Sequence, residues 1–324
     1  MNQEPDYVNL DPRVEPVAYA LPRNPTTRRT ARLMQQIWKY RLAYLFISPA
    51  IAVVLIFIGY PVIDSLILSL DRWDGLGKST FIGLDNYRAM FSNTSGLLDS
   101  LRITVIFTAC TTLGTATLGF FLAVAIAERV RGWRFFRIVN FIPVLLPMTV
   151  VGVLWGMLLD PTNGAVNTVI SSLGFSPPLW LASPSTALWT IILVSIWQYT
   201  GFPMIVFLAA IEGIPLELYE AARMDGANGW QRLRYITWPL VQGVALVLVM
   251  LQVIFGMRTF DVAWAMTQGG PGTATTLLGV KLYQSAFLYS DYGYGSTVAV
   301  AMIVIIGTIA FVYLRLVRPL VATT

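Results

Sequence analysis

Six long stretches without a charged residue most constrain how this chain of 324 residues can fold. A helix needs roughly 20 apolar residues to cross the hydrocarbon core of a bilayer, which is about 30 Å thick. We therefore predict an all-α membrane protein with six transmembrane helices. A β-barrel is disfavoured because its strands would show alternation over about ten residues. The six predicted spans are Ala43–Ile63, Ile103–Ala127, Ile138–Leu159, Ala187–Ile211, Tyr235–Met257 and Tyr292–Leu314.

The composition supports a membrane protein and excludes several kinds of chemistry. Hydrophobic residues make up 56% of the chain and charged residues 12%, whereas a soluble domain is about 25% charged. There is no histidine, which excludes serine–histidine triads, imidazole metal sites and histidine proton relays. The single cysteine, Cys110, cannot form a disulfide framework. We expect neither a catalytic site nor a metal site.

The positive charges predict the orientation of the chain in the membrane. Segments on one side of the six spans hold 16 lysines and arginines, and those on the other side hold 6. By the positive-inside rule, both termini and the loop 128–137, which contains four arginines, are cytoplasmic. The isoelectric point near 9.4 then reflects membrane topology, and we expect no nucleic-acid binding.

Outside the spans, the N-terminal region divides into two segments. Residues 1–30 contain five prolines and few apolar residues, which predicts a flexible cytoplasmic tail. Residues 31–41 mix aromatic and basic side chains, as expected of an interfacial helix or of a flank that snorkels before the first crossing. Residues 42–320 form the six-helix domain.

Prolines mark an irregular third span and an ordered loop after it. Pro143 and Pro147 interrupt the third apolar run, so we expect a bend that leaves a cavity between helices. The loop Asp160–Thr186 has no lysine or arginine and is predicted to be external, with a short surface helix.

Two helix faces combine polar and aromatic residues in the fourth and fifth spans. Such faces suit a sugar, whose hydroxyls need hydrogen bonds while its C–H faces rest on aromatic rings. The alternative is that the polar groups simply hold membrane helices together. The predicted substrate-path residues are Ser195, Gln198, Tyr199 and Phe202 in one span, and Gln252, Phe255 and Thr259, close to Arg258 and Asp261, in the other.

The chain shows no obvious energy source of its own. No span has a carboxylate near its middle, which disfavours carriers driven by protons or sodium. Gly77-Lys78-Ser79 resembles a phosphate loop, but the required glycine is replaced by Arg72. Transport driven by ATP would therefore need a partner subunit.

The segment Ile214–Leu240 is a polar, glycine-containing island between two apolar spans. Pro215 suits the first position of a helix, and Gly226 suits a left-handed residue that ends one. A second short helix, Trp230–Thr237, is expected to lead to the fifth span. The charge count predicts that this helix–turn–helix is cytoplasmic.

The motifs in this island resemble those of the membrane subunits of binding-protein-dependent ABC importers of the carbohydrate class. Their cytoplasmic EAA loop has an E-A-A motif, then D-G-A, and ends in proline. Leu233 departs from the aromatic residue that is common there. The matching residues here are Glu220, Ala221, Ala222, Asp225, Gly226, Ala227 and Pro239, and further similarities are Tyr60-Pro61, Gly83–Tyr87, Pro143, Gly164, Asn167 and Gly269-Gly270-Pro271.

The resemblance implies an ABC importer permease fold and a subunit of a larger assembly in a prokaryotic cell membrane. Its implied partners are a second homologous permease subunit, an ABC ATPase dimer, an extracytoplasmic solute-binding protein and a sugar substrate. This chain would bind no cofactor, and ATP and Mg would be used by the ATPase, in which the EAA loop docks. The alternative left open is a secondary carrier or channel that acts without an ATPase.

Overall fold

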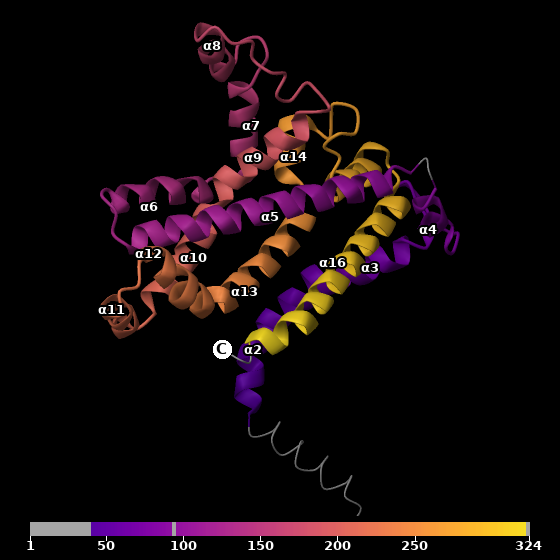
Figure 1. Ribbon diagram of the computed structural model, residues 1–324. Coiled ribbons are helices and arrows are strands. Elements are labelled where there is room, and N and C mark those ends of the chain that lie inside the picture. Colours follow the sequence, from indigo (N-terminus) through magenta and orange to yellow (C-terminus); the bar gives the residue numbers. More distant parts are fainter. Residues whose placement is uncertain (1–39, 93–94, 322–324) are drawn as a thin grey trace, which may run out of the picture. The chain divides into compact units, whose positions relative to one another are not determined.

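The computed structural model describes residues 40–92 and 95–321, which are mostly helical (Figure 1). The predicted tail 1–30 and nearly all of the segment 31–41 lie outside the described residues. The elements are α2 (Arg41–Val54), η1 (Leu55–Gly59), α3 (Tyr60–Leu68), β1 (Asp71–Arg72), β2 (Thr80–Phe81), α4 (Asp85–Met90), α5 (Leu97–Ala127), α6 (Trp133–Phe141), η2 (Ile142–Leu145), α7 (Met148–Leu158), α8 (Ala165–Ser172), α9 (Ala187–Tyr199), α10 (Gly201–Glu212), α11 (Leu216–Met224), α12 (Gly229–Arg232), η3 (Leu233–Thr237), α13 (Trp238–Met257), α14 (Asp261–Thr267), α15 (Leu278–Tyr283), η4 (Gln284–Leu288) and α16 (Tyr292–Val321).

Five helices among the described residues are long and apolar enough to cross a membrane. The third predicted span is different, because it consists of two helical parts, Trp133–Leu145 and Met148–Leu158, that meet at an angle of 102°. Counting this bent pair as one span gives the predicted six. The unbroken spans are Arg41–Leu68, Leu97–Ala127, Ala187–Glu212, Gly229–Met257 and Tyr292–Val317.

The chain divides into two compact units, 1–62 and 63–324. The described part of the first unit is one continuous helix, formed by α2, the π-helical turn η1 and the start of α3. No residue of α2 is buried, and its apolar side chains are distributed around the whole helix. An apolar surface on all sides suits a helix that lies in lipid.

Helix α5 is the central element of the second unit, and it packs against α9, α10 and α13 (Figure 1). Phe120, Phe207 and Leu248 belong to the apolar cluster between α5, α10 and α13. The rings of Phe120 and Phe207 meet edge to face with their centroids 5.4 Å apart, which is a favoured aromatic geometry.

Glycines allow α5 to approach its neighbours closely. A Cβ added at Gly119 would lie 2.9 Å from the backbone nitrogen of Met204 on α10. At Gly256 on α13, an added Cβ would lie 2.8 Å from the side chain of Thr108. Small residues commonly serve this purpose between membrane helices, where close packing replaces the hydrophobic effect as the driving force.

The third span breaks at the prolines that predicted a bend. Pro143 lies in the 3₁₀ turn η2, and Pro147 immediately precedes α7 with an extended backbone. Proline removes a backbone donor and blocks the continuation of a helix. The resulting turn is much sharper than a kink, since α7 leaves at 102° to the preceding helix and packs against α14.

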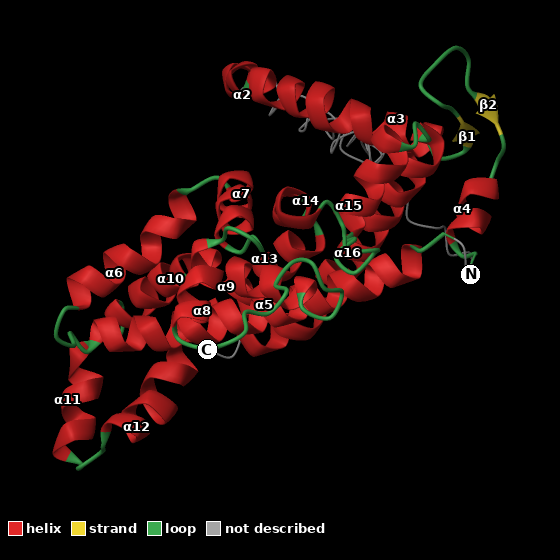
Figure 2. Cartoon of the chain, turned by 90° about the horizontal axis from the view of Figure 1, so that it is seen from above, coloured by secondary structure: helices red, strands yellow, loops and turns green. Residues whose placement is uncertain are grey.

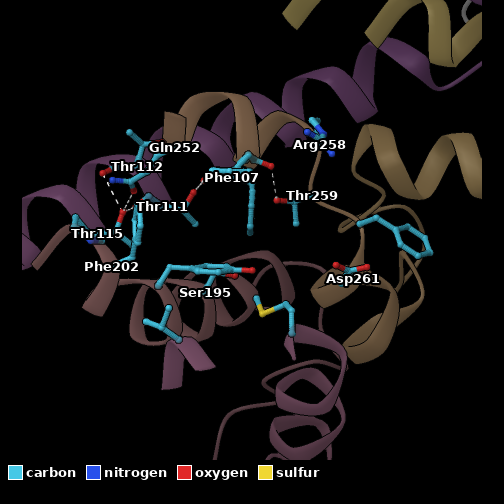
Figure 3. Close-up of a pocket in the computed structure, with 17 residues that line it drawn as sticks. Phe107, Thr111, Thr112, Thr115, Ser195, Phe202, Gln252, Arg258, Thr259 and Asp261 are labelled. Atoms are coloured by element: carbon cyan, nitrogen blue, oxygen red, sulfur yellow. Dashed lines mark hydrogen bonds between the residues drawn. The ribbon is translucent and has the colours of Figure 1, made fainter. Parts of the chain in front are cut away.

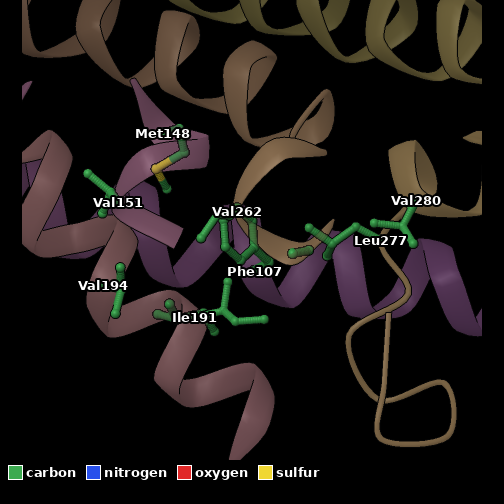
Figure 4. Close-up of a cluster of buried hydrophobic side chains, with 10 residues drawn as sticks. Phe107, Met148, Val151, Ile191, Val194, Val262, Leu277 and Val280 are labelled. Carbon is green, nitrogen blue, oxygen red and sulfur yellow. The ribbon is translucent and has the colours of Figure 1, made fainter. Parts of the chain in front are cut away.

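A buried apolar cluster holds α7, the helix that follows this break (Figure 4). Met148 and Val151 from α7 meet Phe107 from α5, Ile191 from α9 and Val262 from α14. Residues from these three helices, distant in sequence, thus fix the position of α7.

The loop after α7 contains the predicted short helix, α8. Before α8, the carboxylate of Asp160 accepts hydrogen bonds from the hydroxyl of Thr162 and from the backbone N–H groups of Asn163 and Thr162. These bonds lower the pKa of Asp160, because they favour the charged carboxylate. Asn167 links the two ends of the loop by accepting a bond from Trp180 and donating one to the carbonyl of Asp160.

A predicted consequence of this packing concerns Gly119. In Gly119→Val the added side chain meets Met204 and Pro203, and such overpacking costs about 1–3 kcal/mol. We expect a lower thermal unfolding midpoint for the purified protein in detergent. The matched control is Gly243→Val on α13, where an added Cβ meets nothing within 4 Å. Equal midpoints for Gly119→Val and the unsubstituted protein would show that the close contact is not needed.

Candidate functional site

A cavity of about 480 Å³ lies within the second unit, between spans α5, α9–α10 and α13. Its wall is formed by aromatic, hydroxyl and amide side chains together with one arginine and one aspartate (Figure 3). The lining residues are Phe107, Thr111, Thr112, Thr115, Val144, Met148, Ser195, Tyr199, Phe202, Pro203, Gln252, Phe255, Gly256, Arg258, Thr259, Phe260 and Asp261.

The structure brings six of the seven predicted substrate-path residues to this cavity. Ser195, Tyr199 and Phe202 reach it from α9 and α10, because their spacing places them on one helix face. Gln252, Phe255 and Thr259 reach it from α13 and the residues after it.

Gln198, the seventh residue, lies outside the cavity lining and is buried, with 1% of its surface exposed. Its amide nitrogen Nε2 donates a hydrogen bond of 2.9 Å to the carbonyl oxygen of Leu146. Leu146 is at the break of the third span, where the helical hydrogen-bond pattern is interrupted. The structure thus places Gln198 where it supports the bend.

Helix α5 contributes cavity residues that the sequence analysis did not select. Thr111, Thr112 and Thr115 all line the cavity. Together with Thr104 and Thr108 they recur at helical spacing along α5. This spacing was the signal in the sequence that could have identified them. Threonine is common in membrane helices because it can bond its own backbone, as Thr111 does with the carbonyl of Phe107.

One contact joins α5 and α13 across the wall of the cavity. The hydroxyl of Thr115 donates to the side-chain oxygen Oε1 of Gln252 (Figure 3). The amide nitrogen of Gln252 and the hydroxyl of Thr112 are buried and have no hydrogen-bond partner among the described residues. Buried polar groups normally have partners, so these two groups are exceptions beside the wall of the cavity.

A second candidate site is the helix–turn–helix within Ile214–Leu240, which projects from one end of the second unit (Figure 2). Helix α11 begins one residue later than expected, at Leu216, with Pro215 as its cap. Asp225 ends the helix, and Gly226 follows with a φ of 79°. This left-handed conformation favours glycine.

Local bonds fix the shape of this turn. The side chain of Asn228 accepts from the backbone of Gln231, whose own side chain accepts from the backbone of Asn228. This reciprocal capping box starts α12. The hydroxyls of Tyr219 and Thr237 lie 2.9 Å apart and join the two arms of the motif.

The outer surface of the turn is exposed and partly apolar. Glu220, Ala221, Asp225 and Gly226 are exposed, and Ala222 and Ala227 are half-buried. Met224 has 89% of its surface exposed and Trp230 67%. The turn therefore presents short side chains, carboxylates and two large apolar side chains to its surroundings.

Comparison with known proteins assigns this architecture to transport. Residues 116–323 match the family described as "Binding-protein-dependent transport system inner membrane component". The chain is 34% identical to the trehalose/maltose transport system permease protein MalF of Thermococcus litoralis over 86% of this chain and 96% of that protein. It is 35% identical to the sulfoquinovosyl glycerol transport system permease protein SmoG of Agrobacterium fabrum, over 86% and 90% respectively.

The fold is also similar to that of a solved transporter. A chain from the bacterial alginate ABC transporter, in complex with an alginate pentasaccharide-bound periplasmic protein, matches with a TM-score of 0.80. It is 24% identical and covers 90% of this chain and 98% of that chain.

The contact of Gln198 leads to a prediction about stability. Gln198→Leu keeps a similar side-chain size but removes the hydrogen bond to the carbonyl of Leu146, and a typical bond of this kind contributes about 0.5–1.5 kcal/mol. We expect a lower midpoint in thermal unfolding followed by size-exclusion chromatography. Thr111→Val is the control, because its hydroxyl bonds only to carbonyls of its own helix. An unchanged midpoint in Gln198→Leu would contradict a supporting role at the bend.

Proposed function

The chain belongs to the family of inner membrane components of binding-protein-dependent transport systems, and we propose that it is a permease subunit of an ATP-driven importer for a sugar or related polyol. As a member of this family it is a multi-pass protein of the inner membrane. The proposal adds the substrate class, the partners and the means of coupling.

The cavity is the observation that carries the substrate proposal. A sugar presents hydroxyls and weakly polar C–H faces, so it needs hydrogen-bonding groups beside aromatic rings. Tyr199, Phe202 and Phe255 supply rings, and Thr112, Ser195 and Gln252 supply hydroxyl and amide groups. The names of relatives that transport trehalose, maltose and sulfoquinovosyl glycerol support the same class.

The exposed turn supports coupling to a separate ATPase. Its motif comprises Glu220-Ala221-Ala222 and Asp225-Gly226-Ala227, and the structure gives it a fixed shape and an exposed surface. Alanine and glycine leave room for the backbone of a partner to approach. We place this turn in the cytoplasm with both termini, in accordance with the positive-inside rule. ATP and Mg would be used on the partner.

The proposed assembly contains four kinds of component. This subunit forms half of the translocation path, and a second homologous permease subunit forms the other half. An ATPase dimer binds the exposed turn between α11 and α12 of each permease subunit, which we call the coupling turn. An extracytoplasmic solute-binding protein delivers the sugar. The periplasmic protein present with the alginate transporter of similar fold is consistent with this arrangement.

Reconstitution with defined partners tests the proposal. In proteoliposomes that hold both permease subunits, we expect uptake of a sugar from a radiolabelled panel beginning with maltose only when the ATPase, the binding protein and ATP are present. Uptake by this chain without an ATPase would overturn the proposal in favour of a secondary carrier or channel.

Two substitutions in the turn test the coupling within the same assay. Glu220→Lys reverses a charge on the exposed motif, and Gly226→Val forces a side chain into a left-handed conformation that costs about 1–2 kcal/mol. We expect uptake to fall at least about tenfold, with the subunit still in the membrane. Glu212→Lys, an exposed charge reversal just before the turn, is the control. Normal uptake coupled to ATP hydrolysis in both variants would disprove the role of the turn.

The cavity yields a separate prediction. Gln252→Ala removes an amide that faces the cavity, and a lost hydrogen bond of about 0.5–1.5 kcal/mol weakens affinity by roughly 2- to 10-fold. We expect a higher KM for the transported sugar with unchanged binding of the ATPase. Gln284→Ala, which removes an amide outside the cavity, is the matched control. Unchanged KM and selectivity in Gln252→Ala would remove Gln252 from the path.

A further inference from the structure

Arg232, the last residue of α12, joins two parts of the molecule that are distant in sequence. Its Nη2 atom lies 3.6 Å from Oε1 of Glu128, and its Nη1 atom lies 3.5 Å from the carbonyl oxygen of Ala227. The Arg232 side chain is 16% exposed, and its Nε atom is buried without a partner among the described residues. A long basic side chain at a surface loop can usually extend into water, so its burial here favours a specific role for the contact.

The two residues of this ion pair lie at the ends of two spans that line the cavity. Glu128 directly follows α5, a helix without a break from Leu97 to Ala127. Arg232 precedes η3 and α13 within one long span, Gly229–Met257. The pair therefore connects α5 to the α13 span beside the coupling turn.

The same two spans meet again at the cavity, through Thr115 and Gln252. Thr115 lies 13 residues before Glu128, or roughly 20 Å along the helix at about 1.5 Å per residue. A helix of this length transmits a displacement at its end to its middle. Movement of Arg232 against Glu128 would thus alter the distance between the cavity walls.

We propose that the Arg232–Glu128 ion pair transmits movement of the coupling turn to α5 and so to the cavity. Arg232 is a positioning residue in this scheme, acting from inside the turn while the exposed motif contacts the partner. The inference rests on the proposed function, because it requires an ATPase at the turn.

Arg234 provides a matched comparison two residues away. Its guanidinium lies over the ring of Tyr235 at 5.9 Å from the centroid. Arg234 is exposed and makes no ion pair within the described part of the chain. The same charge reversal can therefore be made at Arg232 and at Arg234, with only the first breaking a contact to α5.

Cys110 offers a native reporter of the movement of α5. It is the single cysteine in the sequence, it is half-buried, and it lies one residue before the cavity-lining Thr111. The rate of its reaction with N-ethylmaleimide can be measured in the assembled transporter, without nucleotide and with Mg-ATP and vanadate. This readout requires no knowledge of the sugar.

In the unsubstituted assembly we expect nucleotide to change the labelling rate of Cys110 by at least about 5-fold, the lower end of typical coupling between linked sites. Arg232→Glu should remove this change while the ATPase still co-purifies and hydrolyses ATP. The double variant Glu128→Arg with Arg232→Glu restores the pair with reversed charges and should restore the change. Arg234→Glu breaks no contact to α5 and should keep the nucleotide-dependent change in labelling rate.

The outcomes separate this inference from the proposed function. A nucleotide effect that persists in Arg232→Glu overturns the inference, as does a double variant that assembles but does not recover. Loss of ATPase binding in Arg232→Glu also overturns it, because Arg232 would then act in docking. If the unsubstituted chain neither binds an ATPase nor responds to nucleotide, the proposed function itself fails.

Discussion

The need to pair backbone groups away from water governs this structure more than any single contact. In hydrocarbon an unpaired amide or carbonyl is costly, so spans are helices and breaks occur only where protein surrounds them. The third span illustrates the rule. Pro143 and Pro147 end its first part, and the side chain of Gln198 reaches the carbonyl of Leu146. Helices α5, α9, α14 and α15 contribute to the apolar cluster that includes α7. At the bend, a side chain from α9 supplies the hydrogen bond that the interrupted helix cannot make.

Much of the fold could be predicted because a bilayer imposes a length and a composition that can be seen directly in sequence. The six uncharged runs coincide with the spans and the bent pair. Helix termini could also be predicted where one residue has a strong conformational preference, as with Gly226 after α11. The bend was foreseen at its prolines, although its angle was not, because that angle depends on packing of α7 against α14.

The cavity was only partly predictable. The polar face of α9 could be recognised by spacing, but spacing does not reveal whether a buried amide meets a ligand or another part of the protein. Ser195 and Tyr199 face the cavity, whereas Gln198, on the adjacent face, meets Leu146, 52 residues away in sequence. The threonines of α5 were overlooked because threonine bonds its own helix in many membrane spans. Distant contacts decide such cases, and a local pattern contains no information about them.

The π-helical turn η3, between α12 and α13, has a consequence for the register of the whole fifth span. Such a turn contains one residue more than an α-helical turn, and each residue of an α-helix advances the helix by about 100°. The surplus residue therefore sets the rotational phase between Arg232 at one end and Gln252 at the other. A uniform α-helix of the same sequence would direct one of these side chains away from α5. The irregularity lets a single span face the same neighbour at two levels along its length.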